Sequence, residues 1–531
     1  MNRVVNRVVI SGVIACLIVT ACSDDDNPSA ESTAAAVTTD IADAAASPAT
    51  TDEPSESTAA QTAPDTTVPG PALPFDPGPI EWEEFDGDVD VATVTVPVDY
   101  SDHDGDTFDL FLARSAALDP DNRIGSLLVN PGGPGYGGSD FAFFAAQIFP
   151  RSLRERFDIV GWDPRGTGES DPPIDCIDDY DPYFTDIDTT VETPAEAERL
   201  VDVAEEFAAL CVEQNDTIYN FVGTNNSARD IDSIRQALGE DTITYFGFSY
   251  GSELGATWAT LFPDTVRAAV LDGAADPNAD SLESTLQQLG GFQAALETFL
   301  ASCDDSNACA FAPDGDATDA YTALMEDLDE TPVPGAPGRP MVNRDVATGA
   351  VIQAMYSDTY WPALERSLAD AQSGDGGGLL ALFDNYYERQ PDGTYGNELE
   401  AFQTISCADT ADRPTVAETD AENVAFHEAA PLLVPEGAVG GYFCNFFPAA
   451  RDPRVDVTGA GAGPIVVIGT TGDPATPLSS TEAMASTLED GRLVIVEADQ
   501  HTGYGVNQCV VELVDRYLIE LEAPEGDTLC S

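Results

Sequence analysis

The chain has 531 residues, 43% of them hydrophobic and 22% charged, which is enough for one large domain with an insertion or for two ordinary domains. This composition excludes a wholly disordered or collagen-like protein. The 21 basic residues face 95 acidic ones, so the formal net charge is −74, and a surface this acidic repels nucleic acid and anionic lipid headgroups.

The basic residues are all arginine. The lack of lysine excludes Walker-type phosphate loops, Schiff-base catalysis and Ser-Lys dyads. The chain has only three histidines, His103, His427 and His501, which argues against a multi-histidine metal centre. We therefore expect no cofactor, no metal and no nucleic-acid partner.

The first 21 residues have the form of a secretory signal, with Arg3 and Arg7 before an apolar run that is too short for a dependable membrane span. The run ends in Val-Thr-Ala-Cys, which resembles the bacterial lipobox and predicts that Cys22 is lipidated. A plain cleaved signal is the alternative. We expect an exported bacterial protein that contacts the membrane only through this anchor.

Residues 22–75 are rich in Ala, Thr, Ser, Pro, Asp and Glu and contain no basic residue. Such a segment buries too little apolar surface to offset its ordering entropy, so we predict a disordered tether. Most of the acidic residues lie after it, and the acidity therefore belongs to the folded surface. A halophilic or marine environment explains this acidity; steering of a substrate is the alternative.

The folded part begins with two alternating segments, 88–100 and 107–114, that predict a pair of antiparallel strands. Six short apolar runs follow, each ending at Gly, Pro or Asp, and they predict buried parallel strands with helices such as 194–213 and 228–238 between them. These runs are 125–130, 157–162, 242–248, 266–271, 464–469 and 492–497.

This alternation of strands and helices stops between residues 278 and 455, where helical patterns such as 280–302 take over. We therefore predict an α/β core made of residues 76–277 and 456–531, with a helical cap inserted at 278–455.

The run 242–248 leads into Gly247-Phe248-Ser249-Tyr250-Gly251, a G-x-S-x-G string followed by a segment compatible with a helix. A sharp strand-to-helix turn of this kind exposes Ser249 as a nucleophile and needs glycine where side chains would collide. An ordinary strand-helix turn is the alternative interpretation.

A serine nucleophile needs a base and an acid, and two later strand ends supply them. Asp473 follows run 464–469, and His501 follows run 492–497. Asp499 is the rival acid. His103 lies in a polar turn and His427 in the insertion, so we expect both to be solvated or structural.

The Gly-rich segment 131–138 follows run 125–130 and suits an oxyanion hole, for which we predict the N–H groups of Gly133 and Tyr250 as donors. A phosphate-binding loop is the alternative, but the segment has neither a lysine nor a G-x-G-x-x-G pattern. We expect the segment 161–170 to support the site without taking part in the chemistry.

Eight cysteines remain after Cys16 in the signal and Cys22 are set aside. An even number in an exported chain implies disulfides. They fall into neighbours along the chain, so we predict sequential pairing: Cys176 with Cys211, Cys303 with Cys309, Cys407 with Cys444, and Cys509 with Cys530.

Seven strings together resemble the secreted tripeptidyl aminopeptidase and proline iminopeptidase family of α/β-hydrolases: VTVPVDY, NPGGPG, GWDPRGTGES, GFSYG, ISCAD, GDPATP and QHTGY. The resemblance covers about residues 80–530. It implies a mostly parallel eight-stranded sheet, a helical cap, and a triad of Ser249, Asp473 and His501 that releases short pieces from peptide N-termini.

Two positions depart from the family. Asn130-Pro131 stands where iminopeptidases have His before GGPG, which favours the tripeptidyl branch, and Glu253 lies close after the nucleophile.

The sequence leaves three functions open. The first is an exported, monomeric serine aminopeptidase acting on peptides with a free N-terminus. The second is an esterase or lactonase that uses the same triad. The third is a noncatalytic solute-binding lipoprotein, against which the complete set of Ser, Asp, His and Gly-rich loop argues.

Overall fold

The computed structural model describes residues 75–531, except for 306–308 and 314. The predicted signal, the predicted lipidation site Cys22 and all but the last residue of the predicted tether lie outside the described residues. No helix in the described part of the chain is both long enough and apolar enough to cross a membrane.

A single mixed sheet forms the centre of the molecule, in the order β1-β2-β3-β5-β4-β6-β7-β8-β9-β10. Strands β1 to β3 and the β3–β5 pair are antiparallel, and the other pairs are parallel. The strands are β1 Glu83–Asp86, β2 Val89–Pro97, β3 Thr107–Ser115, β4 Gly125–Asn130, β5 Phe157–Trp162, β6 Ile243–Phe248, β7 Val266–Asp272, β8 Ile465–Thr470, β9 Gly491–Val496 and β10 Thr528–Cys530.

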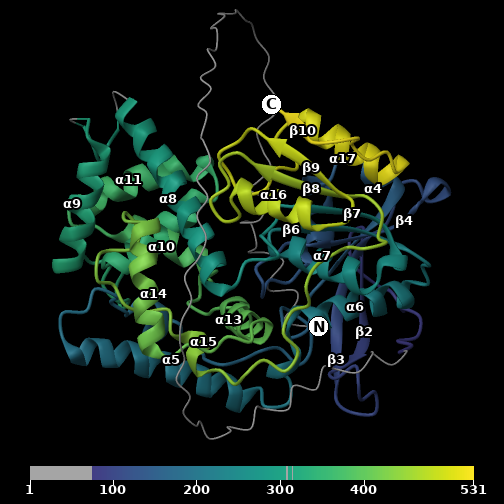
Figure 1. Cartoon of the computed structure of the whole chain (residues 1–531), viewed down its shortest axis with the longest axis horizontal. Helices are drawn as coiled ribbons and strands as arrows, with labels where there is room; N and C mark the ends of the chain where they lie inside the picture. Colours follow the sequence, from purple (N-terminus) through teal and green to yellow (C-terminus); the bar gives the residue numbers. More distant parts are fainter. Residues whose placement is uncertain (1–74, 306–308, 314) are drawn as a thin grey trace, which may run out of the picture.

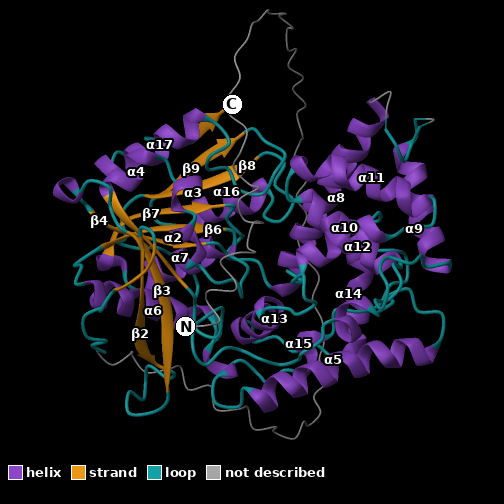
Figure 2. Cartoon of the chain, turned by 180° about the vertical axis from the view of Figure 1, so that it is seen from behind, coloured by secondary structure: helices purple, strands orange, loops and turns teal. Residues whose placement is uncertain are grey.

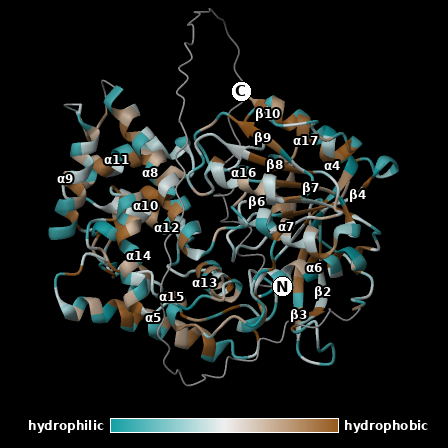
Figure 3. Ribbon diagram, viewed as in Figure 1, coloured by the Kyte–Doolittle hydropathy of each residue, from teal (hydrophilic) through white to brown (hydrophobic). Residues whose placement is uncertain are grey.

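All eight predicted strands are present, as β2 to β9, and the short edge strands β1 and β10 bring the described sheet to ten. Every residue of β4, β5 and β8 is buried, which explains why these strands read as continuous apolar runs. The brown strands in Figure 3 show this concentration of hydrophobic residues in the sheet.

Helices cover both faces of the sheet (Figure 2). One face packs against helices α6 Thr224–Leu238, α7 Tyr250–Leu261 and α16 Leu478–Thr487. The other face packs against α2 Asp140–Phe143, α3 Ala145–Ile148, α4 Arg151–Arg156 and α17 Gln508–Glu520. Because helices cover both faces of the parallel strands, a site is expected at the edge of the sheet formed by the carboxyl ends of these strands.

The described chain between β7 and β8 is helical and lies to one side of the sheet (Figure 1). Most of its helices share a hydrophobic core of their own. Its helices are α8 Ser281–Asp305, α9 Ala317–Glu330, α10 Arg344–Met355, α11 Trp361–Gln372, α12 Gly377–Tyr386, α13 Glu398–Asp409, α14 Val416–Ala429 and α15 Phe443–Phe446.

Helix α5, Pro194–Gln214, differs in place from what its position in the sequence suggests. It lies between two strands of the sheet along the chain, yet its residues Leu200 and Ala204 pack with Tyr442 at the end of the insertion. The helical layer beside the sheet therefore receives chain from two separate segments.

The eight cysteines form four disulfides in the predicted sequential pairs: Cys176–Cys211, Cys303–Cys309, Cys407–Cys444 and Cys509–Cys530. The last pair ties the start of α17 to the edge strand β10. Stable disulfides are typical of proteins that work outside the cytosol.

Arg165, in the segment expected to support the site, is completely buried. Its guanidinium donates two hydrogen bonds to the carboxylate of Asp230, at 2.7 and 2.6 Å, and further ones to the carbonyls of Pro97, Val98 and Phe221. This arrangement satisfies the buried charge and joins β2, α6 and the segment after β5.

Replacing Asp230 with Asn should destabilise the protein by about 3 to 5 kcal/mol, because it leaves the buried guanidinium of Arg165 without its counter-charge. Denaturant unfolding measures this loss. The matched control is Glu155→Gln, which removes the exposed partner of Arg151 and should leave the unfolding midpoint unchanged. A small effect of Asp230→Asn would contradict a structural role for this pair.

Candidate active site

Ser249 occupies a strained turn between β6 and α7. Its φ of 54° lies in the left-handed region, which non-glycine residues rarely adopt. Its N–H donates to the carbonyl of Asp272 at 2.8 Å. A side chain at Gly247 would collide with the backbone of Gly251, so glycine is required for the turn to be this sharp.

Asp473 and His501 come together at the ends of β8 and β9. His501 Nδ1 lies 2.8 Å from Oδ1 and 3.0 Å from Oδ2 of Asp473. Backbone N–H groups of Ala475, Thr476 and Thr502 also donate to this carboxylate. Both residues are buried, and the bonds hold the carboxylate and the imidazole in a fixed mutual orientation.

The other ring nitrogen of His501, Nε2, is buried and has no hydrogen-bond partner among the described residues. Burial acts to lower the pKa of His501, but the charge of Asp473 and its hydrogen bond outweigh burial, so the pKa is raised above 6.5. No hydrogen bond joins Ser249 to His501 in the described part of the chain. Such bonds are often loose until substrate binds.

The Gly-rich segment lies directly against the serine turn. A Cβ on Gly132 would be 2.8 Å from Cβ of Ser249 and 3.1 Å from the backbone nitrogen of Tyr250. The side chain of Asn130 accepts the N–H of Gly132 at 3.0 Å and so shapes this loop. The N–H groups of Gly133 and Tyr250 donate to no other group within the described residues, which leaves both available to an oxyanion.

The other two histidines lie in structural settings. His103 Nε2 is 2.9 Å from the carbonyl of Tyr100, and His427 Nδ1 is 2.8 Å from the carbonyl of Val434. Asp499, the rival acid, makes no hydrogen bond to His501 in the part of the chain that the structure describes. The geometry therefore favours Asp473 over Asp499.

The insertion contributes a contact to the histidine that the sequence did not indicate. The N–H of His501 donates to the carbonyl of Tyr356 at 3.0 Å, and Ser357 pairs with Gln500 as an isolated β-bridge. The rings of Tyr356 and His501 meet edge to face, with centroids 5.6 Å apart. Only the fold could reveal this contact, since no pattern links residues so distant in sequence.

Tyrosines and glutamates gather beside the Gly-rich loop. Burial raises the pKa of Tyr136 well above its usual value, and nearby Glu388, Tyr386, Glu398 and Tyr356 raise it further. Glu388 has a left-handed φ of 52°. A side chain at Gly135 would collide with the backbone at the start of α13, where Glu398 stands, so the loop packs closely against this helix.

Glu253, whose presence after the nucleophile departs from the family pattern, forms an ion pair with Arg454. The Arg454 N–H also donates to the carbonyl of Asp409 at 3.0 Å. Glu253 therefore ties α7 to the chain that returns from the insertion, and this contact gives it a structural role.

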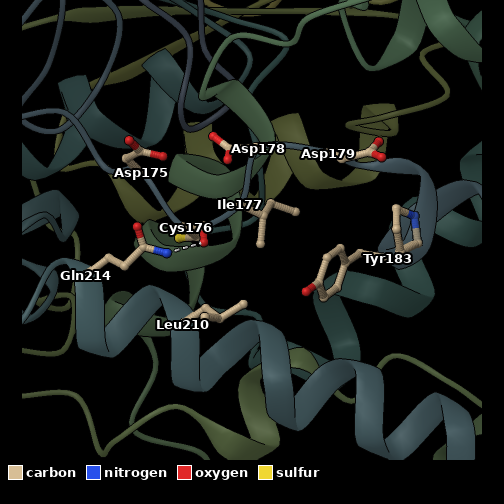
Figure 4. A pocket seen from close by; sticks show the side chains of 9 residues that line it. Asp175, Cys176, Ile177, Asp178, Asp179, Tyr183, Leu210 and Gln214 are labelled. Carbon is tan, nitrogen blue, oxygen red and sulfur yellow. Dashed lines mark hydrogen bonds between the residues drawn. The ribbon is translucent and has the colours of Figure 1, made fainter.

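A pocket of about 370 Å³ lies elsewhere on the described surface, and none of the predicted catalytic residues lines it. Figure 4 shows its lining, which includes Asp175, Asp178 and Asp179. Gln214 closes one end and donates to the carbonyl of Cys176 at 2.6 Å. Within the described ranges, no group of three or more His, Cys, Asp or Glu side chains is arranged to hold a metal ion.

Comparison with known proteins identifies the family. Residues 125–508 match the family described as alpha/beta hydrolase fold. The serine protease Hip1 of Mycobacterium tuberculosis is 35% identical over 489 residues, which cover 85% of this chain and 91% of that protein. The chain belongs to the tripeptidyl-aminopeptidase-like serine peptidases of the α/β-hydrolase family.

Two further relatives carry different names. Carboxylesterase B of Mycobacterium tuberculosis is 35% identical over 453 residues, covering 83% of this chain and 86% of that protein. Tripeptidyl aminopeptidase of Streptomyces lividans is 27% identical over 475 residues, covering 85% and 86%. The predicted family, fold and class of serine hydrolase are confirmed. The names of the relatives differ in the kind of bond that is cleaved, peptide or ester.

Replacing Asp473 with Asn should lower the pKa of the His501 imidazole below its wild-type value, because burial disfavours the charged ring and the main opposing charge is gone. An NMR titration measures this shift. The chain has three histidines, so His103→Gln and His427→Gln assign the signals and serve as controls with an unchanged His501. An unaltered pKa in the Asp473 variant would contradict the pairing.

Proposed function

We propose that this hydrolase is an exported aminopeptidase that releases short units from peptide N-termini through Ser249, His501 and Asp473. The observation that carries the proposal is the buried Asp473–His501 pair, in which Nε2 of His501 has no partner among the described residues. The loop that carries His501 and the strained Ser249 turn both form hydrogen bonds with Asp272. The four disulfides support export. The lipid anchor at Cys22 is supported by the sequence alone.

The reaction follows from these positions. Ser249 Oγ attacks the scissile carbonyl carbon while His501 Nε2 takes the serine proton, and Asp473 stabilises the imidazolium. The carbonyl oxygen becomes an oxyanion facing the N–H groups of Gly133 and Tyr250. When the C–N bond breaks, His501 gives its proton to the leaving amine, and an ester remains on Ser249. Water then attacks this ester, with His501 again acting as base.

Recognition of a free N-terminus is the finer part of the proposal. A substrate ammonium needs a carboxylate partner in a region of low water content. Glu388 and Glu398 stand around Tyr136, three residues after the predicted oxyanion residue Gly133, and Tyr356 connects this group to His501. Both glutamates come from the insertion, which supports a cap that holds the amino end of the peptide.

Ser249→Ala and His501→Ala should each reduce turnover on the order of a millionfold, and the double variant should be no worse than either single one. Asp473→Asn should cost about ten-thousandfold, because the amide favours the wrong imidazole tautomer. Steady-state hydrolysis of a chromogenic peptide amide measures these losses. Asp499→Asn is the control and should match wild type; damage there instead would show that we have chosen the wrong acid.

A tripeptidyl amide with a free N-terminus should be cleaved about a hundredfold faster than the same compound acetylated, because acetylation removes the ammonium and with it a charge-assisted hydrogen bond to a carboxylate. The comparison uses kcat/KM at one pH and fixed salt. Glu388→Gln and Glu398→Gln should reduce the ratio of the two kcat/KM values, because each slows cleavage only of the compound with a free N-terminus. Equal cleavage of both compounds by wild type would reject the aminopeptidase function.

An esterase or lactonase using the same triad is the second candidate, and the relative named carboxylesterase B is the observation that favours it. A short-chain chromogenic ester distinguishes the two. If wild type cleaves the ester and neither amide, the triad stands and the substrate is an ester. If it cleaves neither ester nor amide, both candidate functions fail.

A further inference from the structure

Strand β7 ends at Asp272, between the serine turn and the histidine loop. The main-chain carbonyl of Asp272 accepts the N–H of Ser249 at 2.8 Å. Its carboxylate accepts the N–H groups of Gly503 and Tyr504, each at 2.7 Å. One residue of the central sheet therefore makes hydrogen bonds with both segments that carry the proposed nucleophile and the proposed base.

The carboxylate of Asp272 is completely buried, and within the described residues no arginine pairs with it. A buried charge without an ion-pair partner is costly. We therefore expect the carboxylate to make hydrogen bonds that a neutral side chain cannot make. Each of its oxygens accepts one N–H. Asparagine has only one acceptor oxygen, and its NH₂ group would face a donor. The two hydrogen bonds therefore require a carboxylate.

Gly273, the residue after Asp272, lies close to the imidazole ring of His501. Gly273 has a left-handed φ of 66°, and a Cβ placed on it would lie 3.0 Å from Cε1 of His501 and 3.0 Å from Cγ2 of Thr502. A movement of Asp272 would therefore shift the loop that carries His501. It would also change the contact between Gly273 and the imidazole ring.

We propose that Asp272 is a positioning residue, whose ionised carboxylate holds the loop 501–504 so that His501 Nε2 meets Ser249 Oγ, and whose charge helps to stabilise the imidazolium. It acts through His501 and Ser249 and contacts no substrate. The inference rests on the proposed function, since it assigns a role relative to that nucleophile and base.

The ionisation of Asp272 gives the proposal a signature in pH dependence. Burial, together with the charge of Asp473, raises the pKa of Asp272 to about 7, although the two N–H groups and the nearby charge of His501 act to lower this pKa. These are the charged groups that act on it from the neighbouring loops. Protonation turns one acceptor oxygen into an O–H that faces an N–H. The competent form therefore requires Asp272 ionised and His501 neutral.

The test uses a fluorophosphonate, which reports on the serine and histidine without peptide recognition. Ser249 Oγ forms a bond to phosphorus, fluoride leaves, and the serine proton passes to His501. At pH 8, Asp272→Asn should be inactivated between about tenfold and a hundredfold more slowly than wild type, since a buried hydrogen bond is lost and a donor is misplaced.

The matched control is Asp345→Asn. Asp345 also accepts a backbone N–H, from Thr189 at 2.9 Å, together with the Thr189 hydroxyl at 2.8 Å, but it contacts neither the serine turn nor the histidine loop. This variant should be inactivated at the wild-type rate. Equal slowing of both variants would show general destabilisation and would overturn the positioning role.

The pH profile is the second readout. On the acid side of both pKa values, the wild-type inactivation rate should approach a fall of two powers of ten per pH unit, because two protonations each remove activity, whereas the rate for Asp272→Asn should fall by only one. If Asp272→Asn fails to fold, the wild-type pH profile alone tests the proposal. A wild-type rate that falls by only one power of ten per pH unit would overturn the proposal.

Ser249→Ala separates this inference from the proposed function. Labelling of Ser249→Ala at the wild-type rate would reject the proposed nucleophile. If Ser249→Ala is inert and Asp272→Asn reacts at the wild-type rate, the nucleophile stands and only the role of Asp272 is wrong.

Discussion

The structure depends on the constraint that parallel strands of one sheet end at the same edge. Strands β6, β7, β8 and β9 are neighbours in the sheet, so Ser249, Asp272, Asp473 and His501, each at or just after one of these strand ends, are brought to one place. The chain between β7 and β8 can then accommodate a large insertion without disturbing the alignment, because pairing within the sheet alone sets the positions of the strand ends.

Scarcity of cations shapes how this acidic protein satisfies its buried carboxylates. With 21 arginines for 95 acids, most carboxylates cannot form ion pairs, and several buried ones accept backbone N–H groups instead. Asp163 accepts those of Ser139 and Glu169, both at 2.9 Å, and Asp473 and Asp272 accept those of the loops around the site. Each such carboxylate fixes the backbone around it, so the acids that surround the site also determine the shape of its loops.

The described chain between β7 and β8 is connected to the proposed site at two places. Tyr356 accepts the N–H of His501. At the other end of the site, the carboxylate of Asp409 in α13 accepts the hydroxyl of Thr224, and this hydroxyl lies 2.5 Å from the Tyr250 hydroxyl. Tyr250 also carries a proposed oxyanion donor. A change in the position of these helices would therefore be transmitted to both the proposed base and the proposed oxyanion hole.

The sequence by itself determined the strands, the serine turn, the pairing of the cysteines and the placement of Asp473 and His501 after two strands, because each depends on a local pattern: alternation, burial, glycine at a sharp turn, or position along the chain. It also indicated the family. It did not reveal Asp272, whose role comes from contacts with two loops distant in the chain, although it directly follows the predicted run 266–271. Nor did it reveal Tyr356, Glu388 and Glu398, or the position of α5 beside the insertion. These depend on which surfaces meet after the chain has folded, and packing between distant segments leaves no periodic or positional signal in a single sequence.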